Sequence, residues 1–478
     1  MTGTTTPPTG GTTTPPTTGG TTPPPYAGTA TPPYAGTRPP RLADESPGFL
    51  ARIGQGWAER DIPAPVAPAA ARAAAEHRAR LSACLPDRTL VLAAGRARHR
   101  NGDADYAFRV DSDFLWATSC QIEGAVLVMT PRPGGHDAVL YLPAPARPGE
   151  RDFHAGAAHG ELWVGPSAGL AAWSAALDLP VRPIGDLGER HDGRPEELRT
   201  VLSDLRMIKD DWEIGQLREA VNHTVTGFAA VADEIPRAVA DSLGERWLQG
   251  TFDRHARTFG NGPGYHTIVG SGEHAPILHW VRCDGPVRPG ETLLLDMGVE
   301  ANSLYTADVT RTIPVAGTFT PAQRRVHDLV EAAHRAGMDR VRPGATYTDF
   351  HFAAMEVLAR GLHDWGLLPV SVDEALAPEG QQHRRYLVCG IGHHLGLDVH
   401  DCGSSSYEHY QGAELRPGMV LTVEPGLYFH AHDETLPPEL RGIGVRLEDD
   451  LLVTGTGHEV LSDALPIDAA GLEKWAAR

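Results

Sequence analysis

Acidic and histidine side chains recur within short apolar segments of the C-terminal half of the chain. The segment Glu291–Asp296 (ETLLLD) ends in a carboxylate, and Tyr305–Pro314 (YTADVTRTIP) carries Asp308 inside a strand-like run. Three further segments have the same character: Gly392–Asp401 (GHHLGLDVHD), Leu421–Tyr428 (LTVEPGLY) and Gly442–Asp450 (GIGVRLEDD). We expect carboxylates in such surroundings to be partly buried, where an unpaired charge destabilises the fold or takes up a proton.

This pattern predicts a shared cation. One buried acid could belong to a structural ion pair, whereas four acids and a histidine on separate strands favour metal binding. Oxygen-rich ligand sets with a single imidazole suit divalent ions such as Mn²⁺ or Mg²⁺. Four carboxylates exceed the needs of one ion, and bridging carboxylates usually hold two metals about 3.5–4 Å apart. The residues therefore predict a two-metal hydrolase.

The composition limits the alternatives. The 478 residues are 41% hydrophobic and 22% charged, which excludes a fully disordered chain and, at roughly 100–200 residues per domain, allows more than one domain. The 42 basic and 61 acidic residues give a net charge of −19, so neither nucleic acid nor an anionic membrane is expected as a partner. No apolar run reaches the roughly 20 residues of a membrane span. Five cysteines without a CxxC pair, and no secretory pattern, predict a cytoplasmic protein.

The elements that position these residues follow a biased N-terminal segment. Residues 1–41 are almost entirely Thr, Pro, Gly, Ala and Tyr, which predicts a disordered tail. Residues 42–200 predict an α/β domain, because short apolar runs alternate with helical stretches. The expected strands are Thr89–Ala94, Gly124–Thr130, Ala138–Leu142 and Glu161–Val164, and the expected helices are Pro68–Leu81, Leu170–Leu177 and Pro195–Leu205.

Residues 201–478 predict a second domain of α+β type. Apolar residues at helical spacing predict a long helix over Asp211–Glu234, and a second helix is expected over Ser242–Phe259, with Ser242 as its N-cap and Glu245 completing a capping box. Further helices are expected over Pro321–Met338 and Thr348–Gly361, and strands over Thr292–Asp296, Val420–Val423 and Gly444–Leu447.

Together these segments resemble the metallopeptidases of the pita-bread fold, and most closely the bacterial Xaa-Pro aminopeptidases (aminopeptidase P). The resemblance covers nearly the whole chain after the tail, including Arg109–Phe114 (RVDSDF) and Tyr265–His279 (YHTIVGSGEHAPILH). It implies an α/β N-terminal creatinase-like domain and an α+β C-terminal pita-bread catalytic domain. It also implies two divalent metal ions, taken to be Mn²⁺. Their ligands would be Asp296, Asp308, His393, Glu424 and Glu448, of which Asp308 and Glu448 would bridge the two ions.

The resemblance further implies the residues that handle the substrate. His279 and His400 match histidines that bind the scissile carbonyl region, and Glu424 is expected to be the general base. Arg446 beside the metals counts among both the catalytic and the substrate-binding residues, and Tyr428 matches a pocket tyrosine. The implied reaction is hydrolysis, by a metal-bridging hydroxide, of the bond between an N-terminal residue and a following proline.

Several positions depart from the family pattern or have a plainer interpretation. The two aspartates are twelve residues apart (308 − 296), one more than in many members, and an extra residue in the turn Glu300–Tyr305 would leave both on one face. Cys389, where relatives often have histidine, is interpreted as a small buried residue. His394 is interpreted as a supporting residue, and Asp449 and Asp450 as a solvated strand end.

Other functions stay open beside the aminopeptidase. A prolidase-type Xaa-Pro dipeptidase has the same fold, and these motifs separate the two poorly. A non-catalytic peptide-binding relative and a creatinase-like amidinohydrolase are disfavoured, because all five ligands are present. The expected partners are peptides with proline at the second position and, by resemblance, further copies of the chain in a dimer or tetramer.

Overall fold

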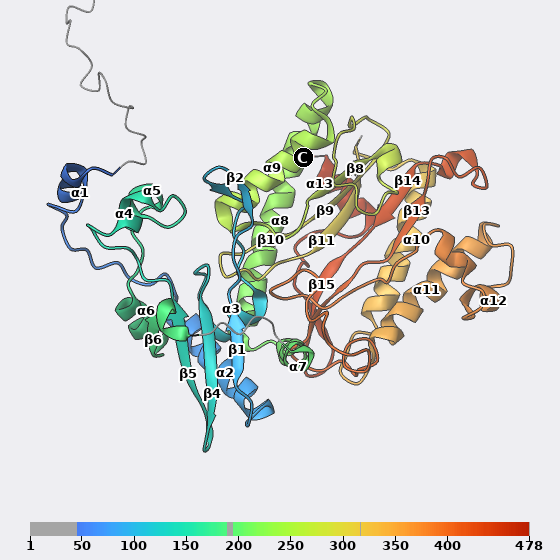
Figure 1. The fold of residues 1–478 in the computed structure, drawn as a ribbon. Helices are drawn as coiled ribbons and strands as arrows, with labels where there is room; N and C mark the ends of the chain where they lie inside the picture. The colour runs from blue at the N-terminus through green and yellow to red at the C-terminus, as the bar shows by residue number, and fades with distance from the viewer. Residues whose placement is uncertain (1–44, 189–194, 316, 478) are drawn as a thin grey trace, which may run out of the picture. The chain divides into compact units, whose positions relative to one another are not determined.

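The computed structural model describes residues 45–188, 195–315 and 317–477 (Figure 1). The predicted tail over residues 1–41 lies outside these residues. The chain divides into two compact units, of which the first ends at Trp57 and the second spans Ala58–Arg478. The described part of the first unit holds one short helix, α1 (Pro47–Ile53), whose N-cap Ser46 accepts a hydrogen bond from the Phe49 N–H. All further elements belong to the second unit.

The N-terminal part of the second unit is built on a four-stranded sheet in the order β1-β4-β5-β6. The β1–β4 and β4–β5 pairs are antiparallel, and β5–β6 is parallel. Helix α2 packs on β5 and α6, and α3 packs on β1 and β4. The strands are β1 (Leu90–Ala93), β2 (His99–Asn101), β3 (Ala104–Asp105), β4 (Val126–Arg132), β5 (Gly135–Leu142) and β6 (Val181–Pro183). The helices are α2 (Pro68–Cys84), α3 (Ser112–Thr118), α4 (Arg151–Ala155), α5 (Glu161–Val164), α6 (Leu170–Leu177) and α7 (Glu196–Arg206).

The α/β character predicted for this region is confirmed, but one of its strands is wrong. Glu161–Val164 is the short helix α5, in which the Val164 N–H bonds to the Gly160 carbonyl. Three apolar residues after a glutamate suit a strand or one helical turn equally well, and flanking glycines permit either.

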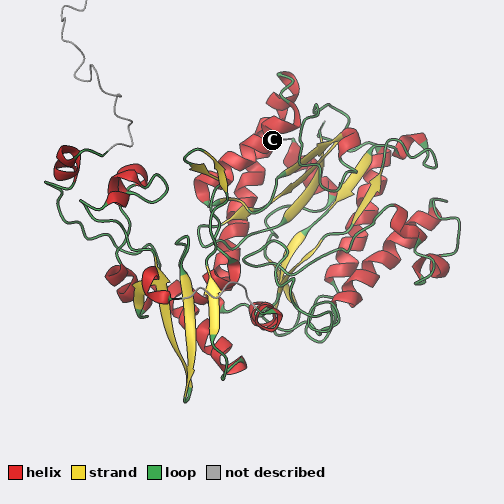
Figure 2. Ribbon diagram, in the orientation of Figure 1, coloured by secondary structure: helices red, strands yellow, loops and turns green. Residues whose placement is uncertain are grey.

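In the C-terminal part, strands lie between two helix pairs (Figure 2). Helix α8 packs against α9 on one side, and α10 packs against α11 on the other. The helices are α8 (Asp211–Ala240), α9 (Gly244–Phe259), α10 (Pro321–Met338), α11 (Tyr347–Asp364), α12 (Val372–Leu376) and α13 (Ala469–Ala476). The strands are β7 (Gly262–Pro263), β8 (Ile268–Ser271), β9 (Thr292–Met297), β10 (Val299–Glu300), β11 (Val309–Pro314), β12 (Val420–Val423), β13 (Gly426–Phe429), β14 (Ile443–Arg446), β15 (Asp449–Val453) and β16 (His458–Val460).

The start of α9 differs from the prediction. The helix begins at Gly244, and Ser242 has a φ of 54° without capping the helix. Glu245 does not reach back to the helix N-terminus, because its buried carboxylate accepts hydrogen bonds from the Ser271 N–H, the Gly285 N–H and the Trp280 indole. Tertiary partners therefore override the local capping pattern.

The register of β9 and β11 decides where the two aspartates lie. The strands are antiparallel, with Asp296 opposite Thr310, so Asp308, two residues before Thr310, shares the face of Asp296. The intervening chain turns at Leu304, which has a φ of 67°. The two aspartates thus lie on one face of the sheet, as predicted. Within the described residues, no helix is long and apolar enough to cross a membrane.

Candidate active site

A cavity of about 850 Å³ opens among the strands of the C-terminal part. Its walls bring together residues from the separate segments singled out in the sequence: Asp296, Asp308, His393, Glu424, Glu448, His279, His400 and Arg446. A larger cavity of about 1210 Å³ lies between α2 and the β4–β5 hairpin, but none of the predicted site residues lines it. The smaller cavity is therefore the candidate active site.

The predicted metal ligands are positioned by strand ends. Asp296 lies in β9, Asp308 directly precedes β11, and Glu424 directly follows β12. Glu448 stands between β14 and β15 and pairs with Thr310 of β11. The loop that carries His393 is fixed beside β12, because the Thr422 N–H bonds to the His393 carbonyl. Five predicted ligands from distant segments therefore converge through the sheet register.

Three of the five predicted ligands have atoms close enough together to hold one ion. Potential ligand atoms of Asp308, His393 and Glu448 all lie within 4.8 Å of one another. The His393 Nε2 atom is 3.2 Å from an Asp308 oxygen and 3.7 Å from a Glu424 oxygen. The Glu448 Oε2 atom accepts a 2.6 Å hydrogen bond from Thr310, whereas its buried Oε1 has no hydrogen-bond partner among the described residues.

A bound cation would stabilise the buried carboxylates of this cluster. Burial raises the pKa of Asp296 and Glu448, and it raises the pKa of Glu424 to about 7. The neighbouring Asp308 raises these pKa values further, while Arg446 opposes the effect. Buried carboxylates that repel one another, with one oxygen left unpartnered, fit divalent cations, which are bound by carboxylates and imidazole. The residues present therefore fit a divalent-metal site.

Arg446 links the carboxylate cluster to Tyr428. Its guanidinium donates to an Asp296 oxygen, to the Thr310 hydroxyl at 3.1 Å and to the Tyr428 hydroxyl at 3.0 Å. Tyr428 is buried and does not line the cavity, so its contact with the predicted site runs through Arg446. His279 and His400 both line the cavity, and the His400 ring lies edge-on to His393 with ring centroids 4.4 Å apart.

Three cavity tyrosines were not predicted. The Tyr265 hydroxyl donates to Asp296 at 2.7 Å, Tyr347 donates to the Gly392 carbonyl, and the Tyr410 hydroxyl accepts from the His394 N–H at 2.9 Å. Tyr265 opens the segment YHTIVGSGEHAPILH, so its motif could have identified it. The other two have no comparable signal, because only the fold brings them to the cavity.

The interpretation of Asp449 and Asp450 as a solvated strand end is wrong. Asp449 and Asp450 are buried, not solvated: Asp449 pairs with Arg311 at 2.6 Å, and Asp450 accepts a hydrogen bond from the Asp308 N–H. The reason is that β15 is the middle strand between β12 and β16. Cys389 is half-buried: it packs against the hydrophobic core and also lines the cavity. His394 is buried outside the cavity lining, in keeping with a supporting residue.

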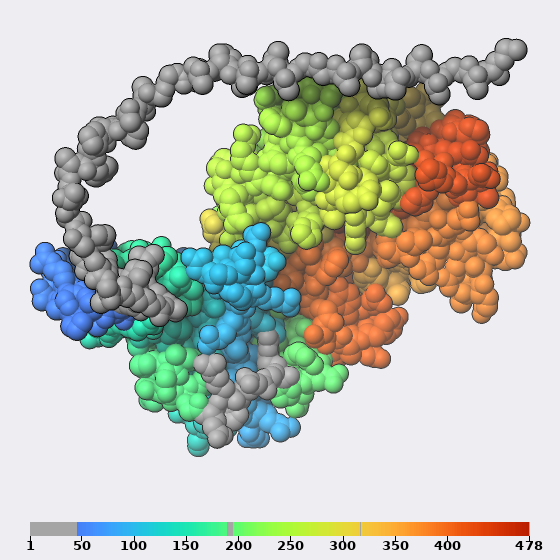
Figure 3. All heavy atoms as spheres, turned by 45° about the horizontal axis from the view of Figure 1, so that its top comes forward, coloured from blue at the N-terminus to red at the C-terminus, as the bar shows by residue number. Residues whose placement is uncertain are grey.

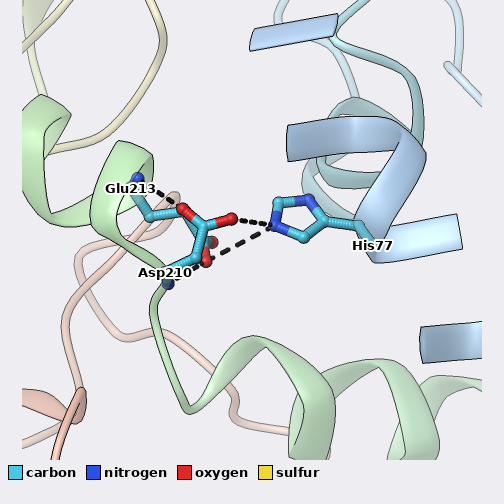
Figure 4. Close-up of side chains that lie close together, drawn as sticks. All are labelled: His77, Asp210 and Glu213. Atoms are coloured by element: carbon cyan, nitrogen blue, oxygen red, sulfur yellow. Dashed lines mark hydrogen bonds and ion pairs between the residues drawn. The ribbon is translucent and has the colours of Figure 1, made fainter. Parts of the chain in front are cut away.

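His77, Asp210 and Glu213 form a second group of possible metal ligands (Figure 4), and none of the three lines the cavity. The His77 Nδ1 atom is 2.8 Å from the Trp116 carbonyl oxygen, and its Nε2 is 2.9 Å from an Asp210 oxygen. Asp210 and Glu213 form the capping box of α8, and Glu213 also accepts a hydrogen bond from Tyr305. Because these atoms already have partners, the group is an ion pair that joins α2 to α8.

Comparisons with known proteins agree with this arrangement. The family model of metallopeptidase family M24 matches residues 215–455, and that of the aminopeptidase P N-terminal domain matches residues 74–193. The chain is 48% identical over 454 residues to "Xaa-Pro aminopeptidase 2" of Streptomyces coelicolor, covering 88% of this chain and 94% of that protein. It is 32% identical over 421 residues to "Xaa-Pro aminopeptidase" of Haemophilus influenzae, covering 83% and 95%.

Solved structures show the same likeness. The low-pH form of aminopeptidase P from Escherichia coli has a TM-score of 0.75 and 28% identity, covering 85% of this chain and 98% of that one. Proline aminopeptidase P II from Yersinia pestis has a TM-score of 0.74 and 28% identity, covering 85% and 99%. These matches confirm the two-part architecture of a creatinase-like N-terminal part and a pita-bread catalytic part.

Proposed function

We propose that this chain, which belongs to metallopeptidase family M24 and is a metallo-aminopeptidase, is a two-metal enzyme that releases the N-terminal residue of peptides with proline in second position. The observation that carries the proposal is the convergence of four carboxylates and one imidazole, from five separate segments, on one cavity. The names of its relatives support the preference for proline.

In this proposal Asp296, Asp308, His393, Glu424 and Glu448 hold two divalent ions, with Mn²⁺ as the metal. Such ions supply a hydroxide nucleophile near neutral pH and polarise the carbonyl that is attacked. The identity of the metal rests on the oxygen-rich ligand set with its single imidazole, which suits hard and intermediate cations.

The remaining residues act on the substrate from the cavity walls. Glu424 takes a proton from the nucleophile and passes it to the proline nitrogen as that nitrogen leaves. His279 and His400 donate hydrogen bonds to the carbonyl region, where negative charge develops in the transition state. Arg446 holds Asp296 in place and is itself oriented by Tyr428. Because proline has no N–H and a fixed φ, recognition rests on the shape of the cavity.

The size of the cavity favours an aminopeptidase over a dipeptidase. Its volume of about 850 Å³ lies toward the upper end of the ~300–1,000 Å³ common for ligand sites and leaves room beyond a dipeptide. Three related proposals accompany this one: a cytoplasmic location, assembly into a homo-oligomer, and a division into domains at residues 42–200 and 201–478.

The test uses metal-stripped full-length protein, with and without added Mn²⁺, on Gly-Pro, on a longer Xaa-Pro peptide and on the same peptide with alanine in place of proline. Mn²⁺-dependent release of the first residue from the longer proline peptide alone supports the proposal. Cleavage of Gly-Pro alone identifies a prolidase. Cleavage of no peptide, with the metal bound, refutes a proline-directed peptidase.

A further inference from the structure

A buried group of charges lies behind the loop that carries His400. The Arg206 guanidinium, at the end of α7, donates to Asp113 of α3 at 2.6 Å and to Asp398 at 2.9 Å, and it also donates to Asp401. The Lys209 ammonium donates to the other Asp401 oxygen at 3.1 Å. Asp398 and Asp401 stand on either side of Val399 and His400, which line the cavity. The loop is therefore held at both ends.

These charges are desolvated, so their geometry is tightly defined. The side chains of Arg206, Lys209 and Asp401 are 6%, 0% and 1% exposed. Although burial opposes ionisation, Arg206 and Lys209 lower the pKa of Asp401 to about 2. Removing one partner of such a buried pair leaves the other charge without compensation, which is strongly unfavourable. The loop consequently has little freedom to move while the pairs are intact.

Close packing ties the charges to the loop backbone. A Cβ atom at Gly396 would lie 2.2 Å from an Asp401 oxygen and 3.0 Å from the Lys209 Cε. The loop backbone thus passes directly over the ion pair, in a space that only glycine leaves open. Lys209 is also one of only two lysines in the sequence, whose other basic residues are arginines. The compact ammonium fits where the larger guanidinium would displace the loop.

The N-terminal part of the unit holds the same loop from a second direction. Arg109 donates to a Glu300 oxygen at 2.9 Å and to the Leu397 carbonyl, and the Ser112 hydroxyl donates to Asp398 at 2.7 Å. Figure 3 shows the blue surface of residues near 100 beside the orange surface of residues near 400. Arg206 and Lys209 lie between the two segments that the family models match, residues 74–193 and 215–455.

We propose that Arg206 and Lys209 are positioning residues for His400. Through Asp398 and Asp401 they fix the loop so that the His400 imidazole stays in the cavity, edge-on to His393. They contact no substrate themselves and act only through the loop. The inference rests on the role of His400 in the proposed function, because it concerns how that histidine is held.

The first test combines Lys209→Met with His400→Ala in the full-length, metal-loaded protein. A displacement of about 1 Å can cost about 100-fold in rate, so Lys209→Met is expected to lower kcat roughly 10- to 100-fold, with the metal content unchanged. In the His400→Ala background, Lys209→Met is expected to lower kcat almost no further. Lys474→Met, at the other lysine, serves as the matched control and should retain normal kcat. An equal loss in both backgrounds would mean a general structural role and would overturn the proposal.

The second test does not depend on activity. Backbone hydrogen exchange of residues 395–402 is expected to speed up in Lys209→Met and not in Lys474→Met, while helix α10 keeps its protection. Unchanged exchange in the loop would refute the proposal. If the unmodified protein cleaves no Xaa-Pro peptide, the proposed function fails, whereas the exchange result still decides whether Lys209 holds the loop. Asp398→Asn, at a half-exposed site, is expected to give the same changes to a smaller extent if Lys209→Met does not fold.

Discussion

Replacing His77 by glutamine is expected to remove a pH-dependent part of the free energy of unfolding. Although burial opposes it, Asp210 and Glu213 raise the pKa of His77 from 6.5 to about 9. Because the folded-state pKa lies above the unfolded-state value, the stabilisation is complete below pH 6.5 and is lost as the pH rises through 9. The difference of about 2.5 pH units (9 − 6.5) corresponds to about 3 kcal/mol, at ~1.4 kcal/mol per unit.

The assay is urea-induced unfolding of metal-stripped protein at pH 6.5 and pH 9, at one ionic strength. The unmodified protein should lose about 3 kcal/mol more between these pH values than His77→Gln does, because the two proteins differ only at residue 77 and all other titrating groups are common to both. His363→Gln, at a half-exposed histidine, is the control and should behave like the unmodified protein. Parallel pH dependences for the unmodified protein and His77→Gln would refute the assignment of a buried imidazolium between α2 and α8.

Further predictions concern the candidate active site. Asp308→Ala or Glu448→Ala should remove the bound metal and nearly all activity, as measured by elemental analysis, and near-normal metal content would disprove their role as shared ligands. His400→Ala should keep its metal but lose roughly 10²–10³-fold in kcat, the usual cost of one transition-state hydrogen-bond donor, whereas loss of metal would make it a ligand. Adding Mn²⁺ to metal-stripped protein should raise its Tm, since the carboxylate cluster lacks a counter-charge without it; an unchanged Tm would contradict that electrostatic account. Gly396→Ala should cost about 1–3 kcal/mol in urea unfolding through overpacking against Asp401, and a neutral result would show that the loop can shift.

The sequence predicted the parts of the fold that depend on short-range patterns. The helix starting at Asp211 follows from apolar residues at helical spacing, and the aspartates of β9 and β11 share a face because side chains alternate along strands; both patterns are local properties. Each ligand segment could also be identified separately, because its carboxylate or imidazole interrupts an apolar run. The joint presence of these side chains in one cavity follows from the register of the strands.

The errors lie where tertiary contacts decide. Glu245 stands at the right spacing for a capping box, but its carboxylate accepts hydrogen bonds from Ser271 in β8 and from the Trp280 indole rather than from the start of its own helix. Asp449 and Asp450 look like a charged strand end, and only the position of β15 between two other strands shows that they are buried. The local sequence contains no information on the distant partners of Glu245 or on the strands that flank β15.

The ion pairs behind the His400 loop could not be predicted from the sequence for a different reason. Arg206 and Asp401 are 195 residues apart, and neither belongs to a motif that points to the other. An arginine near a helix end is most often a solvated residue, so only the folded chain shows that it is buried against three carboxylates.

The buried ion pairs of Asp401 with Arg206 and Lys209 also limit how far the chain can be shortened. The family model for the catalytic part begins at residue 215, which would be an obvious starting point for an isolated fragment. A fragment cut there would retain the buried Asp401 and lose both of its cations, along with Asp210 and Glu213 at the start of α8. The smallest autonomous catalytic fragment therefore begins before Arg206, and proteolysis between Lys209 and residue 215 should inactivate the enzyme even though no catalytic side chain is removed.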